Sequence, residues 1–403
     1  MSAGRSSAVA LAATTHFQRP IVDAHKDSRA QIHSTGKERL TARTASTEWE
    51  MRVLMRIVLR IIAVIAVSVI VAVGIFGWLY TMQPTPRAVE GWLLGPALPA
   101  ARGELATAVG YAQACPAPPC PEAERLYVLG GLSGFFRPAR RVSVYDPNRK
   151  VWNAGPSLPA PRHHFAAASL EQALFVSGGT DVAGLHLSHQ YWPPRDNFWR
   201  LALGSDRWEI AAPMIEPRWG HRMVAHDGRL YVVGGRGPSG RVLIYAPETG
   251  WRMGADMPQP RDHLSVVVVD GRIWAIGGRD PRSLARVDIY DPAANSWQPG
   301  PDLPATTSGA AEGVIDGIIF IYGGEEPSFL NGGIKDLHWM LDTRAAAQGW
   351  RHAPAPPLPV HGTNGAVLQG AFVIPAGASR HGALSMAGWS NVLQLMKPAE
   401  AVR

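Results

Sequence analysis

DGRLYVVGG, residues 227–235, reads as a short strand that ends in two consecutive glycines. Residues 230–233 are apolar and include a tyrosine and two valines, which suits a position in a sheet. Glycine weakens the interior of a strand and usually marks a bend or a close approach of two backbones. The double glycine therefore predicts a sharp turn at the end of this strand.

The same ending recurs along the chain. It returns as ERLYVLGG (124–131), QALFVSGG (172–179), DGRIWAIGG (270–278) and DGIIFIYGG (316–324), and Pro375-Ala376 blur it in a sixth copy, GAFVIPAG (370–377). From the second glycine of one copy to that of the next, the steps are 48, 56, 43, 46 and 53 residues. A spacing of this size indicates a repeat architecture.

Each repeat holds four short strands. A third strand ends in a turn at VSVYDP (142–147), VLIYAP (242–247) and VDIYDP (287–292). Proline cannot continue the ladder of hydrogen bonds, and aspartate bonds back to the nearby backbone. A tryptophan then opens a fourth strand that closes on proline, as in WNAGPSLP (152–159) and WQPGPDLP (297–304). An apolar first strand leads from there to the next double glycine.

The ordered set of double glycine, Tyr-Asp-Pro and tryptophan resembles the kelch repeat. The resemblance covers residues 92–396 and implies a β-propeller, in which each repeat is a four-stranded blade around a central channel. Blade two departs from the pattern by an insert at 180–197, and blade six by its blurred glycines.

The two ends of the repeat region predict how the ring closes. The region begins with WLLGPALP (92–99), which is a fourth strand without a blade of its own. It ends with NVLQLM (391–396), which is a third strand without a fourth. We therefore expect an all-β, six-bladed kelch propeller over residues 92–403, in which 92–99 pairs with 391–396. Such closure removes the exposed edges of an open sheet.

A single transmembrane helix is expected before the propeller. Residues 61–80 carry no charge, and as a helix they would span about 30 Å, the thickness of a bilayer core. We place the helix at 52–80, a disordered tail at 1–51 and a linker at 81–91. Arg52, Arg56 and Arg60 precede the apolar stretch, so the positive-inside rule puts the N-terminus in the cytoplasm and the propeller outside. A cleaved signal peptide is the competing interpretation, and Met51 is an alternative start.

Composition narrows the compartment and the partners. Arginine outnumbers lysine 34 to 5, which is typical of a GC-rich bacterial genome, so we expect an inner-membrane anchor and a periplasmic propeller. Residues 1–60 hold ten basic and five acidic residues, against 29 and 27 in the rest, so the net charge of +7 reflects membrane orientation rather than nucleic-acid binding. Cys115 and Cys120 are expected to form a disulfide. No metal site and no cofactor are expected.

The resemblance also implies where a ligand would meet the propeller, since two positions per blade look toward its central mouth. The first position, directly after the double glycine, is occupied by Leu132, Thr180, Arg236, Arg279, Glu325 and Ala378. The second, in the loop between blades, is occupied by His163, Trp219, Asp262, Ser308 and His361, with Arg102 and Glu104 nearest to it in blade one. Three arginines that follow a proline at the blade junctions are interpreted as structural, pairing neighbouring blades: Arg162, Arg218 and Arg261.

A binding module for protein or glycan is the favoured function, because the sequence has no nucleophile elbow and no metal cluster. The ligand-binding candidates are Arg236, Arg279, Trp219, Thr180, Ser308, Arg102 and Glu104. The alternative is a periplasmic sugar mutarotase resembling the sialic-acid epimerase. Its acid and base would come from Glu325, Asp262, His163 and His361, and two of the arginines would hold a substrate carboxylate. A copper oxidase of the galactose-oxidase type is rejected, because both cysteines lie in one loop outside the mouth.

Overall fold

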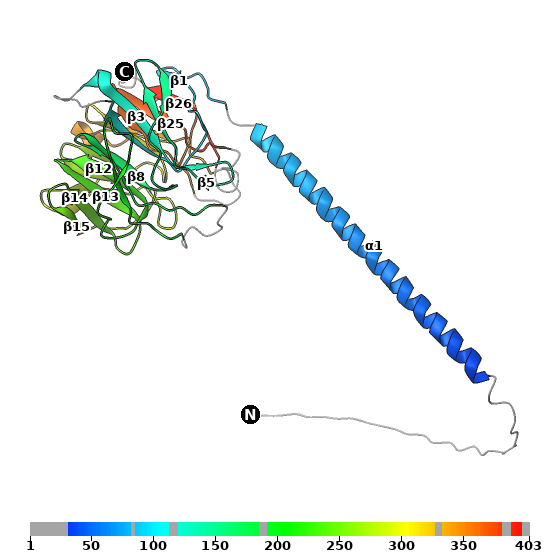
Figure 1. Ribbon diagram of the computed structural model, residues 1–403. Helices are drawn as coiled ribbons and strands as arrows, with labels where there is room; N and C mark the ends of the chain where they lie inside the picture. Colours follow the sequence, from blue (N-terminus) through cyan, green and yellow to red (C-terminus); the bar gives the residue numbers. More distant parts are fainter. Residues whose placement is uncertain are drawn as a thin grey trace, which may run out of the picture. The chain divides into compact units, whose positions relative to one another are not determined.

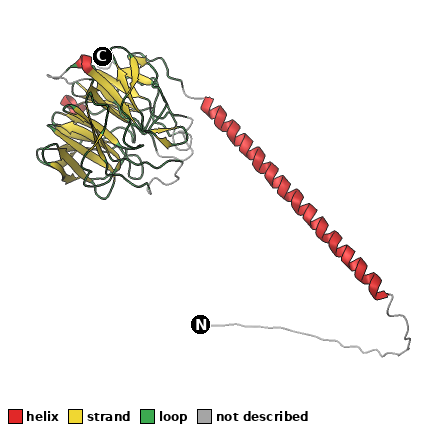
Figure 2. Ribbon diagram, in the orientation of Figure 1, coloured by secondary structure: helices red, strands yellow, loops and turns green. Residues whose placement is uncertain are grey.

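The computed structural model describes residues 31–81, 85–112, 120–184, 192–326, 333–380 and 388–396. The chain divides into two compact units, Met1–Gly74 and Ile75–Arg403, and each is described by itself. The first contains most of one long helix, α1 (Gln31–Thr81), and the second consists mostly of β-strands (Figures 1 and 2).

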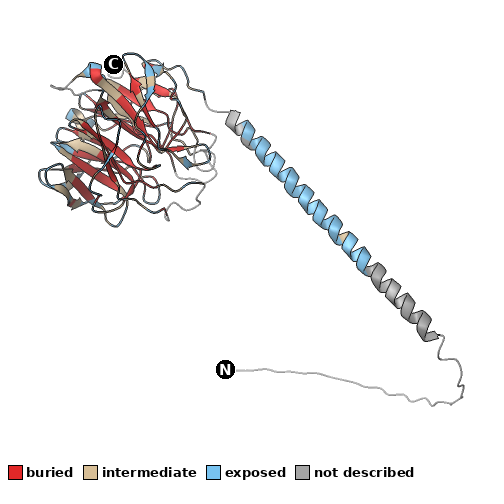
Figure 3. Ribbon diagram, in the orientation of Figure 1, coloured by how far each residue is buried: buried red, intermediate tan, exposed pale blue. Residues whose placement is uncertain are grey.

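Helix α1 contains one segment, Thr47–Ile75, that is long and apolar enough to cross a membrane. Its mean hydropathy is 2.8 and none of it is buried within the protein, as the pale blue helix in Figure 3 shows. The helix begins at Gln31, well before the start at residue 52 expected from the sequence. The stretch KERLTAR (37–43) explains the difference, because most of its residues are good helix formers.

Six four-stranded antiparallel sheets form the blades. Blade one contains β2 (Ala106–Tyr111), β3 (Glu124–Leu129), β6 (Val142–Asp146) and β7 (Val151–Ala154), with a small hairpin of β4 (Leu132–Ser133) and β5 (Arg137–Pro138). Blade two contains β8 (Ala166–Leu170), β9 (Ala173–Ser177), β10 (Phe198–Ala202) and β11 (Glu209–Ile210). Blade three contains β12 (Trp219–His226), β13 (Arg229–Arg236), β14 (Arg241–Ala246) and β15 (Gly250–Asp256).

The remaining blades repeat this order. Blade four contains β16 (Ser265–Val269), β17 (Arg272–Ile276), β18 (Val287–Asp291) and β19 (Ser296–Pro299). Blade five contains β20 (Ala311–Ile315), β21 (Ile318–Tyr322), β22 (His338–Asp342) and β23 (Arg351–His352). Blade six contains β24 (Ala366–Leu368), β25 (Ala371–Pro375), β26 (Leu393–Met396) and β1 (Trp92–Gly95). The six-bladed propeller expected from the repeats is therefore confirmed.

The predicted closure of the ring is also confirmed. Strand β1 pairs antiparallel with β26, from Trp92 opposite Met396 to Gly95 opposite Leu393. Beyond the strand, the amide of Leu98 donates to the carbonyl of Asn391 at 2.7 Å. The first and last strands of the propeller thus complete one sheet.

The core lies between the blades rather than in a single centre. Six clusters of buried apolar side chains each join two neighbouring blades around the ring. Between blades three and four, for example, Tyr231, Val233 and Ile244 pack with Val266 and Ile273. The second strand of each blade is mostly buried on both faces, which explains why these strands read as continuous apolar runs in the sequence.

The double glycines join neighbouring blades through the backbone. The amide of Gly235 in blade three donates to the carbonyl of Arg261 in blade four at 2.9 Å. Its φ is +85°, and a Cβ at this position would lie 2.7 Å from the Cβ of His221. Gly131, Gly179, Gly278, Gly324 and Gly377 donate to the next blade in the same way. The structural interpretation of these glycines is therefore correct.

The blade-junction arginines require a correction. Their backbone carbonyls accept the bonds between blades, but their side chains bond within their own blade. The guanidinium of Arg218 donates to the carbonyl of Gly234 and pairs with Glu216, and all three residues lie in blade three or in the loop that leads into it. A guanidinium has several N–H donors, so one arginine can bond to several backbone carbonyls at the strand ends of its own blade.

One histidine is buried between blades two and three. His221 on β12 is fully buried, and its Nε2 lies 2.9 Å from the Oγ of Ser177 on β9. Burial, together with the positive charges of Arg218 and Arg222, lowers the pKa of His221 from 6.5 to about 3. The ring is therefore neutral in the folded protein at any pH above that value.

We expect this histidine to make the propeller sensitive to acid. Below pH 6.5 the unfolded chain binds a proton at His221, whereas the folded chain binds it only near pH 3. Stability therefore falls as the pH drops from 6.5 to about 3. The loss reaches about 2–3 kcal/mol near pH 4.5. Urea unfolding of the protein and of His221→Gln, each above pH 6.5 and near pH 4.5, measures this loss of stability. The raised pKa of Glu312 acts in both chains and cancels in the comparison; an equal loss in both chains would contradict the assignment.

Candidate functional site

The two predicted mouth positions of each blade lie side by side. Isolated bridges join His163 to Thr180, Asp262 to Arg279, Ser308 to Glu325 and His361 to Ala378, and β12 and β13 pair Trp219 with Arg236. In blade one the partner of Leu132 is Gly103, which stands between the two residues named from the sequence. The repeats were therefore aligned in the correct register, while a ligand-binding role for these residues stays a prediction.

Most of these side chains are buried rather than open to solvent. His163, Thr180, Trp219, Asp262, Ser308, Glu325, His361 and Arg279 are each between 0% and 6% exposed. The side chain of Arg236, by contrast, is 40% exposed. The rim of the mouth therefore offers few of the predicted groups to a large ligand, and Arg236 is the most accessible of those just named.

Two of the predicted ligand-binding residues are buried and bonded within the propeller. The indole Nε1 of Trp219 donates to the carbonyl of Trp192 at 3.2 Å, and the ring is only 1% exposed, so it is not an open stacking surface. Arg102 lies inside blade one, where its Nη2 donates to the carbonyl of Val128 and to Ser143 Oγ. Burial, together with the charge of Arg141, lowers its pKa to about 10. Arg102 is thus the blade-one counterpart of the structural arginines.

A ring of backbone hydrogen bonds surrounds the propeller axis. It joins one residue of each interblade loop, namely Glu104, His164, Gly220, His263, Gly309 and Gly362. From His164 onward, the amide of each residue donates to the carbonyl of the one before, and the amide of Leu105, the residue after Glu104, closes the circle by donating to the carbonyl of Gly362. All six residues have φ between +51° and +69°, a region that favours glycine. We call these six residues the axial ring.

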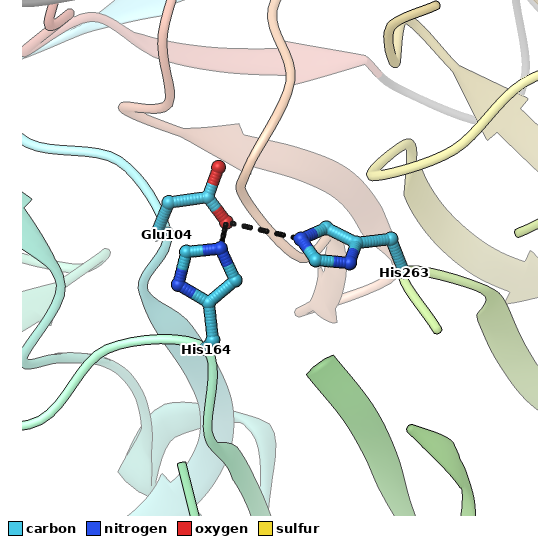
Figure 4. Close-up of side chains that lie close together, drawn as sticks. All are labelled: Glu104, His164 and His263. Atoms are coloured by element: carbon cyan, nitrogen blue, oxygen red, sulfur yellow. Dashed lines mark ion pairs between the residues drawn. The ribbon is translucent and has the colours of Figure 1, made fainter. Parts of the chain in front are cut away.

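The axial ring gathers two histidines and a carboxylate. Nε2 of His164 lies 3.2 Å from Oε2 of Glu104, and Nε2 of His263 lies 3.8 Å from the same oxygen. Figure 4 shows the three side chains pointing toward one another from three different loops. Glu104 was named from the sequence, but the two histidines were missed because their preceding neighbours were chosen. The signal that could have found them is the glycine at the same place in three other blades.

Charged groups around Asp262 are paired with one another. Arg279 donates to Asp262 at 2.7 Å and to Glu325 at 2.9 Å, while Arg236 Nε contacts the other oxygen of Asp262 at 2.6 Å. Burial opposes ionisation of Asp262, but Arg279, His263 and Arg236 hold its pKa well below the usual range. Asp262 is therefore a carboxylate and not a proton donor. Both arginines expected to hold a substrate already have protein carboxylates as partners.

Glu325 has a histidine as well as an arginine beside it. Its Oε2 lies 3.0 Å from Nδ1 of His361, whose Nε2 lies 3.0 Å from the carbonyl of Arg380. Glu325 and His361 are both acid–base candidates from the sequence, and the structure brings these two side chains together. Its side chains are 3% and 4% exposed, so a substrate would need a path to them from the mouth.

A hollow of about 700 Å³ opens beside blades three and four. Its lining combines aromatic rings, prolines and charged groups: Trp192, Pro194, Trp219, Arg236, Pro238, Pro260, Asp262 and Arg279. The guanidinium of Arg236 lies over the ring of Trp219, 5.8 Å from its centre. A pocket lined by both apolar and charged groups suits a side chain or a peptide turn.

The predicted disulfide is not tested by the structure. Cys120 belongs to the described residues and Cys115 lies outside them, so the bond between the two stays a prediction.

Comparison with known proteins gives short matches within the repeats. Residues 260–304 match the family model described as Kelch motif. Kelch-like protein 35 of Mus musculus is 32% identical over 116 residues, which cover 28% of this chain and 18% of that protein. Kelch-like protein 26 of Mus musculus is 35% identical over 95 residues, covering 24% and 14%. Beta-scruin of Limulus polyphemus is 33% identical over 103 residues, covering 26% and 11%. The matches therefore span less than a fifth of each relative.

Proposed function

Because this chain belongs to the kelch-repeat β-propellers, we propose that it is a protein-binding module whose partner docks over the hollow beside Arg236. The observation that carries the proposal is the state of Arg236. Its side chain is 40% exposed, whereas the Asp262 side chain that it contacts is 1% exposed. An arginine anchored from below and open above is typical of protein interfaces, where arginine is enriched.

The chemistry of this edge favours an acidic partner segment. Asp262 contacts Nε of Arg236, and the indole of Trp219 lies under the guanidinium. A guanidinium fixed in this way loses little freedom when a second carboxylate binds its remaining N–H groups. The prolines that line the hollow then receive the apolar residues beside that carboxylate.

A sugar mutarotase is supported less well. That reaction would need an arginine pair for the substrate carboxylate, together with an acid and a base. Asp262 and Glu325 already pair with Arg279, and Arg236 already pairs with Asp262. These buried charges are already paired with one another, which makes the site rigid. A carboxylate substrate would therefore have to displace one of these protein partners. Glycan binding remains the alternative for the same hollow.

We further propose that the propeller is anchored by Thr47–Ile75 and lies outside the cytoplasm, in the periplasm of a bacterium. The length and hydropathy of this helix support the anchor, and the arginines on its N-terminal side support the orientation. A phosphatase that is active only outside the cytoplasm, fused after Arg403, tests the placement. An inactive fusion would contradict the placement of the propeller outside the cytoplasm.

The partner proposal is tested by selecting displayed random peptides on the purified protein. We expect enriched peptides to contain an acidic residue, and to bind Arg236→Ala at least tenfold more weakly, because the anchored guanidinium is lost. Arg241→Ala is the matched control, because Arg241 on the same blade is 48% exposed and pairs with Asp256, but does not line the hollow.

The same protein is screened by thermal shift against a panel of sugars that includes sialic acid. If an anionic sugar raises the melting temperature, and Arg236→Ala with Arg279→Ala abolishes the shift, the glycan alternative replaces the protein partner. Peptides that bind Arg236→Ala as tightly as Arg241→Ala would also contradict the proposed docking site.

A further inference from the structure

Glu104, His164 and His263 converge on the propeller axis, and we propose that they bind a divalent first-row transition metal ion. Each of the three offers one ligand atom, and these atoms all lie within 4.8 Å of one another. Neither the cysteine pair nor any motif in the sequence predicted a metal here. The set of two imidazoles and one carboxylate is one that Zn²⁺ and Fe²⁺ accept in proteins.

The choice of residues in the axial ring points to a purpose other than folding. All six ring positions have positive φ, and three of them are glycine. A residue with a side chain costs free energy in this conformation, so glycine would serve the backbone best. The three positions that are not glycine hold a glutamate and two histidines, and their side chains meet (Figure 4).

The hydrogen bonds of the neighbouring His163 indicate which ring nitrogen of His164 carries the proton and which has the free electron pair. Nε2 of His163 lies 3.0 Å from the carbonyl of Val182, which only accepts, so this nitrogen carries the proton. With both rings neutral, Nδ1 of His163 accepts and Nδ1 of His164 donates to it. Nε2 of His164 therefore directs an electron pair toward Glu104, 3.2 Å away.

His263 is oriented in the same way. Its Nδ1 donates to Asp262, a carboxylate whose side chain is 1% exposed. Its Nε2 thus faces Glu104 with an electron pair as well. Metal-binding histidines almost always donate their other N–H to such an outer acceptor, which fixes the tautomer and the ring. Asp262 and His163 provide these acceptors here.

The distances suit a metal after small side-chain rotations. Ligand atoms of a tetrahedral zinc site are about 3.3 Å apart, because each bond is about 2.0–2.1 Å long. The two distances to Glu104 are 3.2 and 3.8 Å. Three protein ligands leave at least one coordination position open for water or for a group of a bound partner.

Other charged groups face this place and set its preference for a cation. Nη2 of Arg279 lies 3.3 Å from Nε2 of His263 and would give up that contact to a metal, while keeping Asp262 and Glu325. Nδ1 of His361 lies 3.6 Å from Oε1 of Glu104. The carboxylates of Glu104, Asp262 and Glu325 carry three negative charges, and Arg236 and Arg279 carry two positive charges. With the imidazoles neutral, the group therefore has one net negative charge.

The test uses the full-length, untagged protein in detergent, stripped with a chelator and titrated with Co²⁺ alone. We expect one equivalent to bind and to give the visible absorption bands of a four- or five-coordinate ion, and one equivalent of Zn²⁺ to abolish them. His164→Gly and His263→Gly should weaken binding at least 100-fold. Glycine already occupies three ring positions with the same φ, so these variants keep the backbone conformation.

Asp262→Asn should weaken Co²⁺ binding 10–100-fold, because it weakens the outer hydrogen bond of His263 and removes one negative charge beside the site. His352→Ala, which removes an exposed histidine of blade five, should leave binding unchanged. If a glycine variant loses its β-sheet circular dichroism, His263→Gln replaces it in the comparison. Wild-type protein that shows no such bands and retains no zinc after gel filtration would overturn the proposal. Glu104 and His164 would then form an imidazolium–carboxylate pair.

Discussion

A chain shortened to begin at Ala100 is expected to lose cooperative unfolding, whereas one that begins at Thr85 keeps it. The shorter chain lacks β1, so blade six has three strands and the edge of β26 is exposed. It also lacks Trp92, which is 7% exposed and meets the ring of Tyr322 edge-on at 5.2 Å. Losing a buried tryptophan alone costs about 3–5 kcal/mol.

Further contacts leave with the same segment. Leu98 is 2% exposed, and its amide bonds to Asn391 across the closure. Adding the loss of this leucine, about 2–5 kcal/mol, gives a sum comparable to the whole stability of a typical domain, about 5–15 kcal/mol.

Urea unfolding followed by tryptophan fluorescence and by circular dichroism measures the difference between the two chains. The chain from Thr85 is the matched control, because it lacks α1 equally but keeps β1 and the bond from Arg87 to the carbonyl of Pro357. Equal midpoints and equal slopes in the two chains would contradict a stabilising role of the closure.

The propeller could be predicted because its signals are local and repeated. A double glycine, an Asp-Pro turn and a tryptophan fix each strand of a blade within a few residues. The closure followed from the same signals, because the fragments at 92–99 and 391–396 supply the strand that the other lacks. Even the register of the mouth was correct, since it depends only on counting from the glycines.

The composition of the site could not be predicted as well, because it depends on where side chains point. The sequence places Arg102 and Trp219 near the mouth, but both turn inward to carbonyl groups of their surroundings. The pairing of Arg236 with Asp262 joins neighbouring blades, and no periodicity encodes it. The axial ring was missed by one residue, since a positive φ cannot be read from a histidine as it can from a glycine.

Replacing Arg261 by alanine is expected to lower the free energy of unfolding by about 3–5 kcal/mol. The side chain is fully buried in blade four, where it donates to the carbonyls of Gly277 and Ala275 and contacts Asp288 at 2.7 Å. Alanine leaves two buried carbonyls without this donor and removes one cation from a carboxylate that is itself fully buried. Lysine would not restore the loss, because a single ammonium cannot reach all three acceptors in the geometry of the guanidinium fork.

Arg286→Ala is the control that separates a buried ion pair from a partly exposed one. Arg286 also contacts Asp288 at 2.7 Å, but its side chain is 38% exposed, so we expect a loss below about 1 kcal/mol. Urea unfolding of the three chains measures both values, and equal losses would contradict the assignment.

Acid provides a second check on the same pair. Burial opposes ionisation of Asp288, but Arg286 and Arg261 hold its pKa below the ordinary value of 3.8. The stability that this pairing contributes is therefore present above pH 3.8 and is lost as the pH falls through the lower pKa of the folded state. The difference between the protein and Arg261→Ala should shrink there, because a protonated Asp288 no longer needs the cation. A difference that stays constant down to pH values below that pKa would mean that the two carbonyl groups, and not Asp288, are what Arg261 stabilises.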